Sequence, residues 1–204
     1  MASKSKYKKA KLKIHPITII TVGLILATII VAIVLTVPSK GEKLARDFQN
    51  GSARIGIAQT VELSSDNHLK KVSINSAINS IKKGGTVVLL IGSFDSNFTV
   101  TNVGVFDSHF DKSVKASDKD GPKISNYTDC ILFVNYKKIE DGINAVNQLK
   151  DTFGLDIEVN EDDPAIIMTF VNGALAVDSN DVVESTRAIV ARETFKKTIA
   201  IIEK

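Results

Sequence analysis

The side chains best placed to do chemistry follow one apolar run. Residues 89–100 read LLIGSFDSNFTV, in which the run 87–91 ends at Gly92-Ser93 and hydroxyl side chains follow at Ser96 and Thr99. A loop that leaves the edge of a sheet at such a turn commonly carries functional residues. Thiol–disulfide exchange would need two cysteines there, one to attack and one to resolve the mixed disulfide. Hydroxyls can do neither near neutral pH, so thiol exchange at this loop is excluded.

No other nucleophile has activating neighbours that the sequence can show. Ser96 lacks a Gly-x-Ser-x-Gly elbow, and none of the three histidines has an identifiable acidic partner, so hydrolase chemistry is not expected. The single cysteine, Cys130, begins the apolar run CILFVNY and is expected to be buried, whereas a reactive cysteine needs exposure and a lowered pKa. One cysteine also excludes an intramolecular disulfide and a cysteine-rich zinc site.

Two acidic patterns have residue types that bind metals. Asp107, His109 and Asp111 alternate, so they would share one face of a strand but scatter around the helix expected there. The stretch Asp118-Lys119-Asp120-Gly121 imitates the start of a calcium loop without its later ligands, which favours a simple turn. No phosphate-binding glycine loop or nucleic-acid stacking motif is present. We therefore expect no metal, no cofactor, no nucleic-acid partner and no small-molecule substrate.

The N-terminal region has the pattern of a membrane anchor. Residues 17–37 contain no charge, and at about 1.5 Å per residue such a helix crosses the ~30 Å hydrocarbon core of a bilayer. Six lysines and no acid precede it, which predicts a cytoplasmic N-terminus and an extracytoplasmic C-terminal part. A cleaved signal peptide is the alternative, but this run is longer than usual and lacks an Ala-x-Ala site. The basic tail leaves the rest of the chain at a net charge of −3, against +3 overall.

Downstream periodicity predicts alternating helices and strands. The expected organisation is a basic tail (1–15), a transmembrane helix (16–38), a juxtamembrane connector (39–66) with a short helix near 42–48 and a short strand near 55–61, and an α/β domain (67–204). Within the domain we expect helix 69–83 ended by Gly84-Gly85, strand 86–93, helix 99–115, loop 115–123, strand 130–136, a helix that has Ile139 on its apolar face and is closed by Gly154, a hairpin over 165–177 turning at Asn172-Gly173, and a C-terminal helix. This order predicts a mixed sheet between two layers of helices.

The same order resembles the thioredoxin-like superfamily, with EDDPAIIMTFVNGALAV (161–177) carrying the likeness best. On that resemblance Pro164 stands where the family keeps a cis proline. The turn Ile91-Gly92-Ser93 resembles that of membrane-tethered, bacteriocin-transport-accessory-type members, and it places Ser96 and Thr99 at the two cysteine positions. Shifting the comparison by one residue gives Asp95 and Phe98. Either way the redox motif is degenerate.

The resemblance implies a binding module rather than an enzyme. We expect a redox-inactive, membrane-anchored adaptor or chaperone-like subunit of a membrane or secretion assembly, in a bacterial cell membrane. Its protein-binding groove would be lined by Ser96, Asn97, Phe98, Asp163 and Pro164, with Phe98 as an exposed apolar anchor. One alternative is a thiol oxidoreductase that uses an accessible Cys130 with a partner's thiol. Another is a purely structural subunit with a large exposed apolar patch.

Overall fold

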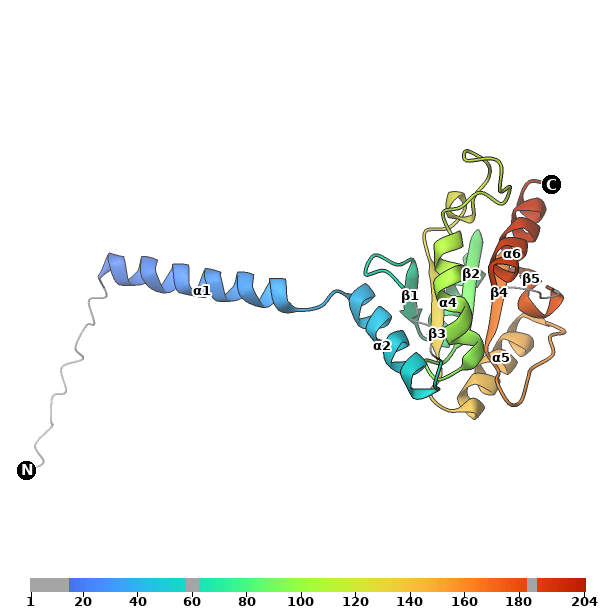
Figure 1. The fold of residues 1–204 in the computed structure, drawn as a ribbon, viewed down its shortest axis with the longest axis horizontal. Coiled ribbons are helices and arrows are strands. Elements are labelled where there is room, and N and C mark those ends of the chain that lie inside the picture. The colour runs from blue at the N-terminus through green and yellow to red at the C-terminus, as the bar shows by residue number, and fades with distance from the viewer. Residues whose placement is uncertain (1–14, 58–62, 183–186) are drawn as a thin grey trace, which may run out of the picture. The chain divides into compact units, whose positions relative to one another are not determined.

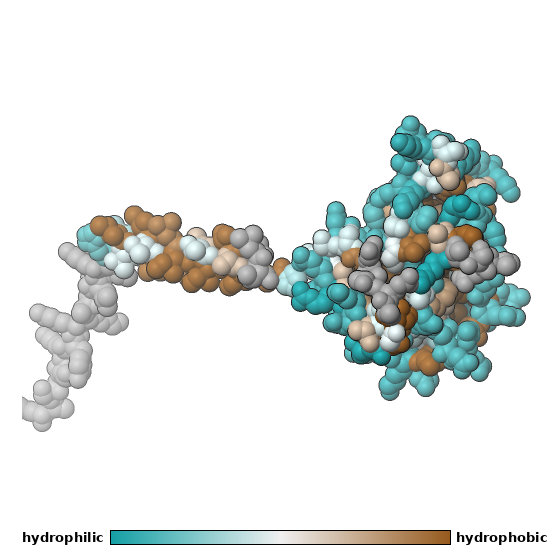
Figure 2. Space-filling view, viewed as in Figure 1, coloured by the Kyte–Doolittle hydropathy of each residue, from teal (hydrophilic) through white to brown (hydrophobic). Residues whose placement is uncertain are grey.

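The computed structural model describes residues 15–57, 63–182 and 187–204, and the chain forms two compact units, Met1–Ser39 and Lys40–Lys204. In the first unit, the described side chains of helix α1 (Pro16–Thr36) are mostly apolar (Figure 2). Its segment Pro16–Ile33 is long and apolar enough to cross a membrane, and none of it is buried. By length and composition α1 could be a membrane anchor or a signal sequence.

The second unit is a mixed α/β fold (Figure 1). Its elements are α2 (Lys40–Arg54), β1 (Leu69–Val72), α3 (Ile74–Lys82), β2 (Thr86–Gly92), α4 (Asn97–His109), the 3₁₀ helix η1 (Ile124–Asn126), β3 (Ile131–Asn135), α5 (Ile139–Phe153), β4 (Ile166–Val171), β5 (Ala174–Asp178), the 3₁₀ helix η2 (Ser179–Asp181) and α6 (Arg187–Ile202). The predicted fold class, mixed α/β with an apolar N-terminal helix, is confirmed at this level.

The five strands form one sheet in the order β1-β3-β2-β4-β5. Strand β3 runs parallel to both β1 and β2, whereas β4 runs antiparallel to β2 and to β5. The parallel strands β1, β2 and β3 require crossover connections, which contain α3 and α4, whereas the antiparallel β4–β5 pair needs only a tight turn. Strands β2 and β3 therefore lie at the centre of the sheet, and both are nearly continuous apolar runs.

Alternate residues of the central strands bury against different helical layers. On one face Val88 and Leu90 join an apolar core with α2, α4 and α6. On the other face Leu89 and Ile91 join a second core with α3 and α5. Because side chains alternate along a strand, a strand buried on both faces must be apolar throughout, which explains the unbroken run of β2.

Strand β1 corrects the predicted helix over 69–83. The first four residues of that segment form an edge strand paired with β3, and the helix begins only at Ile74. The Ser73 Oγ accepts a hydrogen bond from the Ser76 N–H and so caps α3 at its new start. The strand is short and carries two central lysines, so its alternation is too brief to distinguish from a helical pattern.

Helix α2 is longer than the short helix predicted near 42–48, and it belongs to the second unit. Leu44 and Phe48 on its inner face are buried in the core beside α4. The globular part therefore begins at Lys40 rather than at residue 67. Of the strand expected near 55–61, residues 58–61 lie outside the described residues, and residues 55–57 form a turn and its exit.

Three predicted chain reversals are confirmed: the ends of α3 and α5, and the turn between β4 and β5. Gly84 and Gly85, which follow α3, have φ of 83° and 80°, and Gly154 ends α5 with φ of 64°. Asn172 and Gly173 have φ of 50° and 86°, so both central residues of the β4–β5 turn are left-handed, as a type I′ hairpin requires. The predicted hairpin is thus present with its predicted turn residues.

Candidate functional site

The loop of interest opens at the carboxyl edge of the parallel strands. In the strand register Gly92, the last residue of β2, lies beside Asn135, the last residue of β3. The β2–α4 loop and the β3–α5 connection therefore leave the sheet at the same edge. In α/β sheets with parallel strands this edge is where binding sites form, because successive connections diverge there.

Ser96 and Thr99, the two degenerate redox positions, serve the start of helix α4. Ser96 is the N-cap residue, and its Oγ accepts a hydrogen bond from the Thr99 N–H at 3.1 Å. The Thr99 hydroxyl in turn accepts from the Ser93 N–H at 3.2 Å. Ser96 is 7% exposed and Thr99 is fully buried. Both hydroxyls therefore hold the loop against the helix.

Asp163 joins this loop to the segment that precedes β4. Its Oδ2 accepts hydrogen bonds from the Ser96 hydroxyl at 2.8 Å and from the Phe98 N–H at 3.4 Å. Its Oδ1 accepts from the Tyr136 hydroxyl at 2.9 Å and from the Ala165 N–H at 3.3 Å. One carboxylate thus accepts four donors from three separate parts of the chain. We call Ser96, Asp163 and Tyr136 the carboxylate clamp.

The negative charge of Asp163 is stabilised by its position in the carboxylate clamp. Asp163 lies at the N-terminus of α4, where the positive end of the helix dipole stabilises an anion. Burial raises the pKa of the Tyr136 phenol well above its ordinary value, and the charge of Asp163 and the hydrogen bond to it raise it further. Tyr136 therefore remains a neutral donor across the physiological range. The arrangement stabilises the loop and supplies no activated nucleophile.

Pro164 lies beneath the clamp. It is buried, and its ring packs so closely against Gly142 of α5 that a side chain at residue 142 would collide with it and with Tyr136. The Asp163–Pro164 peptide bond is trans, unlike the cis bond that the family resemblance implies. The trans form is the favoured one for X–Pro bonds by about 0.5–1 kcal/mol.

The other predicted groove residues differ in exposure. Asn97 is exposed, but Phe98 is only partly exposed and packs against the core that includes α2 and α4, so the prediction that this ring is exposed is wrong. The first turn of α4 directs this ring inward. Ile139, which the sequence placed on the buried face of its helix, is instead 44% exposed at the start of α5, on the same edge of the sheet.

Helix α2 holds the loop from its other side. The Arg54 guanidinium forms an ion pair with Asp95 at 2.6 Å, and both side chains are more than half exposed. Gly51 approaches the Phe94 carbonyl so closely that no Cβ would fit between them. The loop is therefore fixed between α2 and the Asp163 segment, and Asn97 and Ile139 are among the accessible side chains around it.

Cys130 lies near the amino ends of the parallel strands, whereas the β2–α4 loop leaves their carboxyl ends. Ile131 pairs with Val88, so Cys130 precedes the amino end of β3, about 17 Å from Gly92 at ~3.3 Å per residue. Burial raises the pKa of its thiol; the charge of Lys70 opposes the increase and that of Asp129 adds to it. The cysteine and the carboxylate clamp therefore cannot act on one substrate group.

We expect Cys130 to react slowly with iodoacetamide near neutral pH. A raised thiol pKa lowers the thiolate fraction, and the thiolate is the reactive form, so the rate should increase as the pH rises above the value usual for cysteine. Mass spectrometry of the folded chain, compared with the same chain in denaturant, measures this rate. Labelling of the folded chain as fast as that of the unfolded chain would contradict the assignment.

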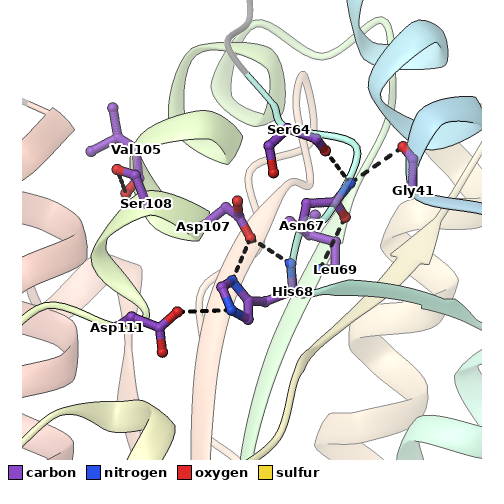
Figure 3. A network of polar contacts seen from close by, with 9 residues as sticks. All are labelled: Gly41, Ser64, Asn67, His68, Leu69, Val105, Asp107, Ser108 and Asp111. Atoms are coloured by element: carbon purple, nitrogen blue, oxygen red, sulfur yellow. Dashed lines mark hydrogen bonds and ion pairs between the residues drawn. The ribbon is translucent and has the colours of Figure 1, made fainter.

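A second polar network surrounds His68 (Figure 3). The His68 Nδ1 lies 3.1 Å from Asp107, and its Nε2 lies 2.9 Å from Asp111. The His68 backbone N–H donates to Asp107 at 2.7 Å, and its ring stacks on Phe110. Because both ring nitrogens are engaged, this network attaches the start of β1 to the end of α4.

The contacts of His68 bear on the metal site that Asp107, His109 and Asp111 could form on a strand. Asp107 and Asp111 contact His68, whereas His109 lines a separate cavity, so the three predicted side chains do not converge. Across the described ranges, no group of three or more His, Cys, Asp or Glu side chains is arranged to hold a metal ion. The sequence offered no signal for His68, because its partners lie about forty residues further along the chain.

Comparisons with protein-family models, curated proteins and solved structures found no match to this chain.

Proposed function

We propose that this protein is a membrane-anchored, redox-inactive thioredoxin-like adaptor that binds a protein partner outside the cytoplasm. The observation that carries the proposal is the β2–α4 loop. It lies at the carboxyl edge of the central parallel strands, and the hydroxyls of Ser96 and Thr99, which the resemblance aligns with the two thiols, form hydrogen bonds that hold the loop. A loop fixed in one conformation, without a reactive group, suits recognition rather than catalysis.

The strand arrangement supports the thioredoxin-like part of the proposal. Three neighbouring parallel strands are followed by an antiparallel pair, and an X-Pro segment precedes the first strand of that pair. The Asp163 segment also faces the β2–α4 loop directly, through the 2.8 Å hydrogen bond between Ser96 and Asp163. These are the two segments that the sequence resemblance pairs across a groove.

The exposed side chains around the loop suggest the contact surface. The direct Ser96–Asp163 bond leaves no space for a polypeptide between the two segments, so a partner would lie across Asn97 and Ile139 instead. Ile139 supplies an apolar anchor, which protein interfaces commonly use near their centre. Among described residues of the second unit, the exposed large apolar side chains are Ile139 and Ile201. Ile139 lies at the start of α5, whereas Ile201 lies near the end of α6.

This distribution favours an adaptor over a permanently packed structural subunit. The visible face of the second unit is largely hydrophilic, with small separate apolar areas (Figure 2). A subunit buried inside a larger complex would present a contiguous apolar patch instead. The oxidoreductase alternative is disfavoured by the raised pKa of the Cys130 thiol and by the position of this cysteine at the far edge of the sheet.

Site-specific photocrosslinking tests the proposed surface. A benzoylphenylalanine placed at residue 97 or at residue 139 is expected to capture one dominant protein partner in cells that express the full chain. Ser96 is unsuitable for the probe because it is buried and any replacement breaks the carboxylate clamp. Lys83, exposed just before the amino end of β2, is the control position at the opposite edge.

The yield at residues 97 and 139 should exceed that at residue 83 severalfold. A broad spread of unrelated chains captured at residues 97 and 139 would indicate a holdase-like function in place of a dedicated adaptor. Equal yields at all three positions, or capture at residue 83 alone, would show that the loop edge is not the binding surface.

A further inference from the structure

A cationic cavity lies away from the carboxylate clamp, between the loop after α4 and helix α6. Its volume is about 400 Å³. Six of the residues around it carry basic side chains: His109, Lys112, Lys115, Lys119, Lys123 and Arg192. Cavities of this size hold small ligands in many proteins. The composition of its lining determines which ligands it could accept.

The loop that supplies the lysines has a defined conformation. The Val114 N–H donates to the Pro122 carbonyl at 3.2 Å, which joins the two arms of the loop. The Asp118 N–H donates to the Lys115 carbonyl at 3.0 Å, and the Asp118 Oδ1 accepts from the Asp120 N–H. At Gly121 a Cβ would collide with the side chains of Ser113 and Asp118. The loop thus presents its lysines from a folded backbone.

Positive charge in this cavity is only partly compensated. Within the described part of the chain, Lys112, Lys115, Lys119 and Lys123 form no ion pair. The lining also includes Asp111 and Asp118. Asp111 is already engaged by His68 at 2.9 Å (Figure 3), which leaves Asp118 as the one lining carboxylate without an ion pair among the described contacts.

The lowered pKa of His109 reflects its burial and the positive charge around it. Burial lowers the pKa of the His109 imidazole, and the charges of Lys112 and Arg192 lower it further. Arg192 contacts Glu193 at 3.3 Å, so part of its charge is compensated on α6. His109 therefore stays neutral near neutral pH, where it can donate to or accept from a bound group while the lysines provide the charge.

We propose that this cavity binds a phosphate group. Phosphate has several oxygen acceptors and multiple negative charge, which match a lining rich in ammonium groups with one guanidinium. The phosphate could belong to a soluble anion or to a lipid headgroup, since both present the same oxygens. This site is independent of the clamp and of the proposed adaptor surface, because none of its lining residues contributes to either.

Isothermal titration of the full chain in an uncharged detergent tests the proposal. Pyrophosphate is the soluble probe. Short-chain phosphatidylglycerol, kept below its micelle concentration, is the lipid probe, and short-chain phosphatidylcholine is its zwitterionic control. We expect saturable binding to at least one anionic probe, with an affinity that falls as salt is added. The preferred probe identifies the source of the phosphate.

Two matched triple variants separate a site from general charge. Lys115→Gln, Lys119→Gln and Lys123→Gln together should weaken binding by about tenfold or more, which corresponds to ~1.4 kcal/mol. Lys82→Gln, Lys83→Gln and Lys137→Gln together remove the same charge from exposed positions outside the cavity and should change binding less than twofold. Circular dichroism checks that both variants remain folded.

Three results would overturn the proposal. The first is the absence of saturable binding of either anionic probe by the native chain. The second is equal weakening in the two triple variants, which would mean that net charge alone attracts the anion. The third is tighter binding of an acidic peptide such as hexaglutamate than of both phosphate probes, which would assign the cavity to carboxylates.

Discussion

Replacing Phe48 with alanine should destabilise the second unit by about 3–5 kcal/mol, the range usual for a buried phenylalanine. The side chain is fully buried, with its ring 4.8 Å from that of Phe94 and 5.3 Å from that of Phe133 between ring centroids. Its loss would leave a cavity between α2 and the sheet. Urea denaturation of the full chain in an uncharged detergent, followed by far-UV circular dichroism, measures the free energy of unfolding.

The Gln49→Ala variant is the matched control for this experiment. Gln49 is the next residue of α2 and is exposed, so its replacement should change the free energy of unfolding by less than about 0.5 kcal/mol. If Phe48→Ala were equally mild, α2 would be a loosely attached connector, as the sequence pattern suggested, and the globular unit would not begin at Lys40.

Removal of the Asp163 carboxylate should lower the free energy of unfolding by about 3 kcal/mol. Hydrogen bonds to charged groups contribute ~1.5–3 kcal/mol each, and their contributions are not additive. Asp163→Ala deprives the Ser96 and Tyr136 hydroxyls of their shared acceptor and removes the anion at the start of α4. The same denaturation experiment applies. Hydrogen exchange should also become faster at the Phe98 and Ala165 amides, since both lose their acceptor.

Two further variants define what the carboxylate contributes. Asp162→Ala removes the exposed neighbouring charge and should leave stability within about 0.5 kcal/mol of the native value. Asp163→Asn keeps one acceptor oxygen and should fall between the native chain and Asp163→Ala. If Asp163→Ala were as stable as Asp162→Ala, the clamp would not stabilise the loop, and the argument for a fixed recognition surface would fail.

Local features of the fold could be predicted because local physics determines them. Asn172-Gly173 specifies its turn through left-handed backbone angles that these two residues tolerate. Gly154 ends α5 for the same reason. The uninterrupted apolar run of β2 predicts a strand buried on both faces, and the structure places it at the centre of the sheet.

Elements with weak or short local patterns could not be fully assigned from sequence. The four residues of β1 become a strand only because β3 lies beside them, and nothing in Leu69–Val72 specifies that neighbour. The sequence predicts a helix near 42–48 within α2, but the large buried apolar side chains of α2, Leu44 and Phe48, do not specify its full length or its packing in the domain core. In both cases tertiary contacts decide the structure.

In the candidate sites, too, some features follow from the sequence and others only from the tertiary structure. The sequence by itself determined that the β2–α4 loop has no thiol, that Ser96 precedes a helix, and that residues 115–123 form a loop. The tertiary structure alone decided that Asp163 accepts from both Ser96 and Tyr136, residues 67 and 27 positions away, and that Arg192 of α6 completes the cationic cavity. Composition and local backbone preference act within a few residues, whereas charge pairing and burial depend on which distant segments the core brings together.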